Sequence, residues 1–150
     1  MSNDHHPLVE RAREAALRAY APYSRFSVGC AIESVDGEIA VGVNIENACY
    51  RLGMCAEQSA LSAAHQAFGL DKVARIAVAG GNARGGELAG TDPVTPCGGC
   101  RQAILEAAHL SGRDLEVISA SGDGRSVEAR TIGELLPLGF GPDNLKDAAS

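Results

Sequence analysis

The sequence has no apolar run long enough to cross a lipid bilayer, and residues 1–7 carry neither the basic stretch nor the apolar core of a signal peptide. It also has no cluster of lysine and arginine, and its formal net charge is −6. A nucleic-acid-binding protein usually presents a basic surface. These absences exclude a membrane protein, argue against a nucleic-acid partner, and lead us to expect a cytoplasmic protein.

The five cysteines do not suggest a disulfide framework, because their number is odd and no export signal is evident. Reduced thiols used for chemistry are the better interpretation. Cys30 is an exception, since it lies in an apolar, strand-like run where a small buried hydrophobic residue is expected. Cys55, Cys97 and Cys100 remain as candidates for chemistry, and Cys49 is left over.

A chain of 150 residues can bury one hydrophobic core, so we expect a single domain over residues 1–150, with a core from about 8 to 145 and flexible ends. Apolar residues recur at helical spacing in three segments, and short apolar runs alternate with these segments. The expected helices cover residues 8–21, 55–68 and 97–110. The expected strands cover residues 28–32, 39–44, 73–79 and 115–120, with a possible short strand near Val127. This alternation predicts an α/β fold, a three-layer α/β/α sandwich with a mixed sheet of about five strands.

Four local signals complete this prediction. Asp36 and Gly37 form a good tight-turn pair between the first two strands, which should make a hairpin. Residues 80–91 are polar and rich in glycine, and we expect a loop there. Thr131 and Glu134 have the spacing of a capping box. The tail after Leu145 is expected to fray.

Two short segments carry the chemistry, Cys55-Ala56-Glu57 and Pro96-Cys97-Gly98-Gly99-Cys100. Together they offer three thiols and one carboxylate. A catalytic zinc ion needs three protein ligands if its fourth position is to stay open for water, whereas structural zinc sites are usually closed by four. Cys97 and Cys100 can hold one ion because the first turn of a helix brings residues i and i+3 together and its free N–H groups stabilise thiolate charge. Glu57 follows Cys55 closely enough to reach the water without occupying the metal.

These segments follow the zinc deaminase pattern, in the variant with three cysteine ligands. Three further segments strengthen the match: residues 20–26, 42–50 and 135–142. Together they resemble the cytidine deaminases of the small, homotetrameric type, and the resemblance runs from about residue 8 to 145. It implies the same three-layer architecture, in which the two metal-bearing helices lie side by side.

The resemblance implies one Zn²⁺ per subunit, held by Cys55, Cys97 and Cys100, with Glu57 as the catalytic group that moves protons. The implied reaction is the hydrolytic deamination of cytidine and 2′-deoxycytidine to uridine and 2′-deoxyuridine, with release of ammonia, as in pyrimidine salvage. No organic cofactor is required, because Glu57 is restored in each cycle.

The resemblance also implies substrate contacts, residue by residue. Phe26 matches the aromatic residue that packs on the pyrimidine, and Asn44 and Glu46 match the pair that hydrogen-bonds a ribose hydroxyl. Ala56 offers its backbone N–H to the base carbonyl. Three more positions match residues that reach a neighbouring subunit's pocket: Ala48, Tyr50 and Phe140. A homotetramer with active sites shared between subunits follows from this match.

Two positions depart from the family pattern. Gln58 stands where the family usually has an arginine that hydrogen-bonds the thiolates, and Arg51 stands where it usually has proline. Three thiolates leave a Zn²⁺ cluster with a charge of about −1, and nearby positive charge would offset it. Our hypothesis is that Arg51 and the two helix N-termini supply part of that positive field.

Other interpretations of the same residues remain. Cys97 and Cys100 alone would suit a redox dithiol, although this function leaves Cys55 and Glu57 unexplained. A non-catalytic, zinc-stabilised module would need a fourth protein ligand, and Cys49 is the candidate. A related deaminase acting on a modified cytosine nucleoside shares the metal pattern. Each alternative differs from a cytidine deaminase in metal content, ligand number or substrate.

Overall fold

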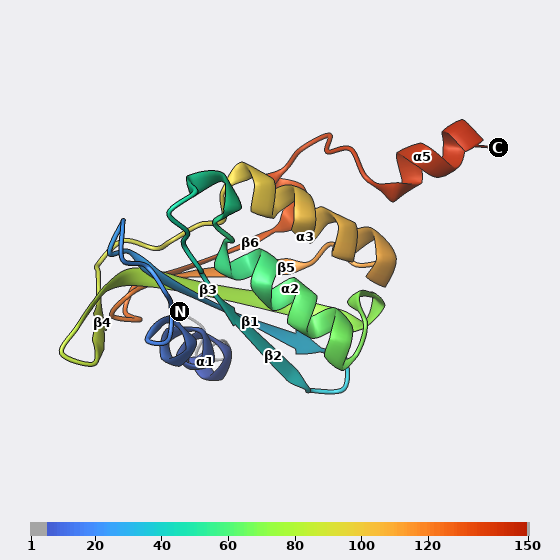
Figure 1. Ribbon diagram of the computed structural model, residues 1–150. Helices are drawn as coiled ribbons and strands as arrows, with labels where there is room; N and C mark the ends of the chain where they lie inside the picture. Colours follow the sequence, from blue (N-terminus) through green and yellow to red (C-terminus); the bar gives the residue numbers. More distant parts are fainter. Residues whose placement is uncertain (1–5, 150) are drawn as a thin grey trace.

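A mixed β-sheet forms the centre of the computed structural model, which describes residues 6–149 (Figure 1). Five strands follow the order β2-β1-β3-β5-β6. Their bounds are β1 (Ser27–Ser34), β2 (Ile39–Val43), β3 (Val73–Arg84), β5 (Glu116–Ser121) and β6 (Val127–Thr131). β3 and β5 are parallel, and the other neighbouring strands are antiparallel. A sixth strand, β4 (Glu87–Ala89), pairs with β3 outside this path.

Helices cover both faces of the sheet, as Figure 1 shows. On one face, α1 (His6–Ala16) packs its apolar side against β1 and β3. On the other face lie α2 (Ala56–Ala67) and α3 (Gly98–Ser111), side by side. The remaining helices are short: η1 (Tyr50–Leu52), η2 (Leu70–Lys72), α4 (Ile132–Leu135) and α5 (Pro142–Ala149). The predicted three-layer α/β/α architecture is therefore confirmed, with six strands in place of about five.

The central strand β3 is apolar on both of its sides. Ile76 and Val78 belong to the cluster under α2 and α3, whereas Ala77 and Ala79 belong to the cluster under α1. All four are fully buried. Because side chains alternate between the two faces of a strand, a strand covered by helices on both faces needs an unbroken apolar run. The sequence has that run, and the interior strand predicted there is confirmed.

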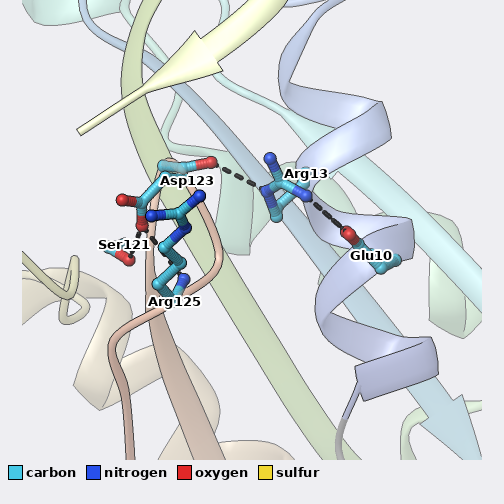
Figure 2. Close-up of polar contacts among 6 residues, drawn as sticks. Glu10, Arg13, Ser121, Asp123 and Arg125 are labelled. Atoms are coloured by element: carbon cyan, nitrogen blue, oxygen red, sulfur yellow. Dashed lines mark hydrogen bonds and ion pairs between the residues drawn. The ribbon is translucent and has the colours of Figure 1, made fainter. Parts of the chain in front are cut away.

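α1 is held close to the sheet by a small residue and by an arginine. A Cβ atom at Gly29 in β1 would lie 2.0 Å from the backbone oxygen of Ala12, so only glycine allows this approach. Nε of Arg13 donates to the carbonyl oxygen of Gly122 at 2.7 Å. Figure 2 shows Arg13 reaching from its helix toward the turn that carries Asp123. The helix is thus anchored to two distant parts of the chain.

Most local predictions are confirmed. β1 and β2 form the expected hairpin, with Gly37 at φ +88° in its turn. β6 occupies the expected position near Val127. Thr131 and Glu134 make the predicted capping box, in which each side chain accepts from the other's backbone N–H.

The prediction of a loop over residues 80–91 was wrong. β3 continues to Arg84, turns through Gly85 and Gly86, and pairs with β4. Both glycines have positive φ angles, +58° and +81°, which is the conformation of a tight type I′ hairpin turn. Adjacent glycines mark such a turn as readily as a loop, and the short partner strand gives little periodicity by which to distinguish them.

Two helix ends also differ from the prediction. α1 ends at Ala16, and Leu17, Arg18 and Ala19 follow with tighter bonds between residues i and i−3. The tail expected to fray after Leu145 continues α5 to Ala149. Residues 1–5, on which part of the prediction of a leaderless chain depends, lie outside the described residues. None of the helices between residues 6 and 149 combines the length and the hydropathy of a membrane span.

Candidate active site

Three thiol groups meet where α2 and α3 begin. The sulfur atoms of Cys55, Cys97 and Cys100 all lie within 4.8 Å of one another. Cys55 is the N-cap of α2, Cys97 is the N-cap of α3, and Cys100 lies in the first turn of α3. The two helices run side by side (Figure 1), which brings residues far apart in the sequence to one point. The structure thus brings together all three predicted metal ligands.

The pKa values of the three thiols are shifted in different directions by their surroundings. The backbone N–H of Cys100, at the start of α3, is the main cause that lowers the pKa of the Cys97 thiol. Burial is the main cause that raises the pKa values of Cys55 and Cys100. A bound cation would favour the ionised form of all three sulfurs. The donor set therefore fits a soft divalent metal ion, and zinc in particular.

Cys49 lies outside this group of three. Among the described residues, the cluster able to hold a metal ion contains Cys55, Cys97 and Cys100 and no fourth cysteine, histidine or carboxylate. Cys49 is exposed and caps the 3₁₀ helix η1. The arrangement matches the three-ligand sites that keep a position open, and not the closed sites of structural zinc.

Glu57 is the buried carboxylate beside the thiols. Its side chain lies in the first turn of α2, and the residue is 5% exposed. Burial is the main cause that raises its pKa above that of an ordinary glutamate. A carboxylate whose pKa is shifted toward neutral pH can both take up and release protons there. Glu57 has the properties of a group that moves protons.

Gln58, one of the two departures noted in the sequence, contacts one of the predicted metal ligands. Its Nε2 atom lies 3.7 Å from the sulfur of Cys100 and donates to it. Arg51, the other departure, is exposed in η1. Of these two residues, the neutral amide is the one that contacts a thiol.

A pocket of about 350 Å³ opens beside the thiols. Seven of its lining residues are predicted site residues: Asn44, Glu46, Tyr50, Cys55, Ala56, Glu57 and Cys97. The other six were not singled out from the sequence: Val28, Ile45, Gly53, Met54, Val94 and Thr95. Val94 and Thr95 could have been found, because they directly precede the Pro96-Cys97 segment. The volume suits a small organic molecule.

Three predicted substrate contacts lie elsewhere in this chain. Phe26 lines an adjacent pocket, which shares Val94 with the first. Ala48 and Phe140 line neither pocket. Phe140 is 59% exposed, and its carbonyl oxygen accepts from Nε2 of Gln102 at 2.6 Å.

Asn44 joins the pocket to the start of β1. Its Oδ1 accepts from the backbone N–H of Val28, and its Nδ2 donates to the carbonyl oxygen of Phe26, both at 2.9 Å. The side chain of Asn44 therefore fixes the backbone on both sides of Ser27. One N–H of its amide remains available to a ligand.

Comparison with known proteins agrees with this geometry. Residues 2–111 match the family model described as the cytidine and deoxycytidylate deaminase zinc-binding region. The chain is 40% identical to a cytidine deaminase of Halalkalibacterium halodurans, over 96% of this chain and 99% of that protein. It is 38% identical to a cytidine deaminase of Mycobacterium tuberculosis, over 95% and 93% of the two chains. A crystal structure of cytidine deaminase from Burkholderia pseudomallei has a similar fold, with a TM-score of 0.77 at 42% identity, covering 93% of this chain and 100% of that one.

Proposed function

The chain belongs to the cytidine and deoxycytidylate deaminase family, and on this premise we propose that it hydrolyses cytidine to uridine and ammonia. The observation that carries the proposal is the position of Glu57, a buried carboxylate that lines the same pocket as two of the three converging thiols. A redox dithiol would explain neither Cys55 nor Glu57. The proposed substrates are cytidine and 2′-deoxycytidine, within pyrimidine salvage in the cytoplasm.

The proposed cofactor is one Zn²⁺ ion per subunit, held by Cys55, Cys97 and Cys100. When bound, zinc supplies hydroxide near neutral pH by lowering the pKa of a water molecule in its open position. The fit of the site supports this choice: three sulfur ligands converge, and the cluster includes no fourth protein ligand among the described residues.

Glu57 would carry the protons of the reaction. Its carboxylate takes a proton from water and delivers it to N3 of the cytosine ring, which makes C4 a better electrophile. The oxygen of that water joins C4. Glu57 then passes the remaining proton of that water to the exocyclic amine, which leaves as ammonia. One water is consumed, and the carboxylate ends in its starting form.

The rest of the pocket would position the nucleoside. We propose that Phe26 packs against the pyrimidine, that the Ala56 backbone N–H donates to the base carbonyl, and that Asn44 and Glu46 bind a ribose hydroxyl. The pocket lining supports the roles of Asn44, Glu46 and Ala56, since all three face the space next to Glu57.

We further propose that the protein is a homotetramer whose subunits complete each other's pockets through Ala48, Tyr50 and Phe140. Several large apolar side chains are exposed near the pocket and on the segment after α4. Exposed apolar surface of this kind often marks a contact with another protein chain, which supports the proposed assembly. The exposed side chains include Tyr50 at 78%, Leu52 at 65%, Leu138 at 105% and Phe140 at 59%.

The experiment that tests the proposed function is ammonia release from cytidine by the purified, zinc-loaded protein, beside Glu57→Gln. We expect release by the parent protein and a loss of roughly 10²–10⁴-fold in kcat for the variant, with one zinc still bound. Glu106→Gln is the matched control, because Glu106 is exposed on α3. Absence of release by a folded, zinc-loaded parent would contradict the proposal and favour a modified cytosine nucleoside or a non-catalytic module.

A further inference from the structure

Ser24 joins Glu46 and Phe26 through a single hydroxyl group. Its Oγ donates to Oε2 of Glu46 at 2.5 Å and accepts from the backbone N–H of Phe26 at 3.1 Å. The other carboxylate oxygen of Glu46, Oε1, accepts from the backbone N–H groups of Tyr23 and Ser24 at 2.9 and 3.1 Å. Both oxygens of Glu46 are thus held by the loop that leads into β1.

Hydrogen bonds fix the peptide groups on both sides of Phe26, one with the same loop and one with the residue that follows β2. The N–H of Phe26 donates to Ser24, and its carbonyl oxygen accepts from the side chain of Asn44. Between Ser24 and Phe26, Arg25 adopts φ +60°, a left-handed conformation that is uncommon for a residue with a side chain. Such a conformation persists where surrounding contacts determine it. The contacts of Ser24 and Asn44 are of this kind.

We propose that Ser24 is a positioning residue that holds Glu46 and Phe26 in a fixed relation, so that the sugar and the base of a nucleoside are bound together. The inference rests on the proposed function, because the substrate contacts of Glu46 and Phe26 are part of that proposal. Ser24 itself acts through the carboxylate and the backbone. Neither its loop position nor its sequence neighbours suggest this role, because its partner lies 22 residues away.

The charge state of Glu46 agrees with such a role. The pKa of Glu46 is lowered mainly by the hydrogen bond from the Ser24 hydroxyl. Partial desolvation raises this pKa, and the two backbone N–H groups lower it further. An ionised carboxylate only accepts hydrogen bonds, which suits the capture of a sugar hydroxyl. Arg25 lines a different pocket. The titratable side chains that share a pocket with Glu46 are Tyr23, Tyr50, Cys55, Glu57 and Cys97.

Ser24→Ala tests the inference. We expect the KM for cytidine and the Kd for uridine each to rise about tenfold, with kcat within about twofold, as for the loss of one hydrogen bond to a charged group. The preference for cytidine over 2′,3′-dideoxycytidine, measured as a ratio of kcat/KM values, should fall by a similar factor. Ser24→Thr keeps the hydroxyl and should restore these values. Ser111→Ala is the matched control, because that hydroxyl donates to the carbonyl oxygen of Ala108 on its own helix.

Two further measurements separate a positioning role from a general loss of structure. In Glu46→Gln protein, adding Ser24→Ala should raise the uridine Kd by clearly less than in the parent, because the bond from Ser24 to a charged carboxylate is already absent and only its contact with the Phe26 N–H is left to lose. The pKa of Glu46, followed by carboxyl NMR, should rise in Ser24→Ala and not in Ser111→Ala. An unchanged uridine Kd in Ser24→Ala, or full additivity with Glu46→Gln, would overturn the inference.

The same measurements distinguish this inference from the proposed function. If the parent protein binds uridine but releases no ammonia from cytidine, the proposed function fails. In that case a tenfold higher Kd for uridine in Ser24→Ala would still support the positioning role. If the parent deaminates cytidine and Ser24→Ala binds and reacts as well as the parent, the inference alone fails.

Discussion

The side-chain amide of Gln58 on α2 donates to the sulfur of Cys100 on α3, with 3.7 Å between Nε2 and Sγ. This contact links the two helices at the point where their N-termini converge on the thiols. The amide is neutral, so it orients the sulfur without removing negative charge from a three-thiolate site. Groups that hydrogen-bond metal ligands in this way usually contribute to metal affinity.

Gln58→Ala should therefore weaken zinc binding by roughly 10–100-fold, because Cys100 loses the hydrogen bond from the Gln58 amide. Competition with a chelator of known affinity measures the effect. Gln66→Ala is the matched control, since the amide of Gln66 on the same helix donates to Ser62 and is exposed. Equal zinc affinities for Gln58→Ala and the parent would show that the contact with Cys100 does not stabilise the site.

Arg51→Ala tests the hypothesis that Arg51 contributes positive field at the thiols. The side chain is exposed, and solvent screens such an interaction, so we expect a smaller change in zinc affinity than for Gln58→Ala. The hypothesis also predicts that the pH–rate profile moves to higher pH, because loss of a positive charge disfavours the ionised, negatively charged forms at the site and so raises their pKa values. An unchanged profile would mean that the helix N-termini and Gln58 suffice.

Cys49→Ser should leave the zinc content at one ion per chain and the deaminase activity within about twofold of the parent. Cys49 lies outside the cluster of three thiols, so it has no metal bond to lose. Metal analysis and ammonia release check both expectations. Loss of zinc from this variant would support the closed, four-ligand site of a non-catalytic module.

Much of the fold and part of the candidate site can be predicted from the sequence, because they depend on local spacing. The apolar run that contains Ile76 and Val78 predicts a strand covered on both faces, and the spacing of Cys97 and Cys100 predicts two ligands on one helical turn. The convergence of Cys55 with them depends on how α2 and α3 pack, and it is expected from the resemblance to the zinc deaminases and not from local spacing.

The contacts that escape sequence analysis are those between side chains far apart in the chain. Ser24 lies in a loop, and its partner Glu46 lies beyond a hairpin. Gln58 is visible from the sequence only as a departure from a family pattern, and its contact with Cys100 depends on the side-by-side packing of two helices. The paired glycines, Gly85 and Gly86, illustrate a different limit, because the same residues suit a loop and a hairpin turn.

Gly29→Ala should destabilise the protein by about 3 kcal/mol, because the new methyl group would collide with the backbone of Ala12 and push α1 from the sheet. Urea unfolding measures the change. Gly98→Ala is the control, since a Cβ atom at Gly98 meets nothing within 4 Å. A stability loss below that of Gly98→Ala would show that α1 can move without cost.

Removal of the metal should expose a pH dependence that originates in Glu57. Burial raises its folded pKa above the unfolded value, so the folded, metal-free protein binds more protons than the unfolded chain. The free energy of unfolding should therefore fall as the pH rises from the ordinary carboxyl pKa through the raised one. Zinc-loaded protein should show the opposite slope, because thiols release protons when they bind metal.

Glu57→Gln isolates this contribution, because an amide cannot titrate. Glu46 and Asp123 have lowered pKa values and act in the opposite sense, losing stability as the pH falls. The comparison is therefore between the metal-free parent and metal-free Glu57→Gln across the same pH range, by urea unfolding. The variant should be more stable than the parent above the raised pKa, where the parent must bury a charge, and the difference should shrink toward low pH. A difference that is constant with pH would contradict the assignment of the slope to Glu57.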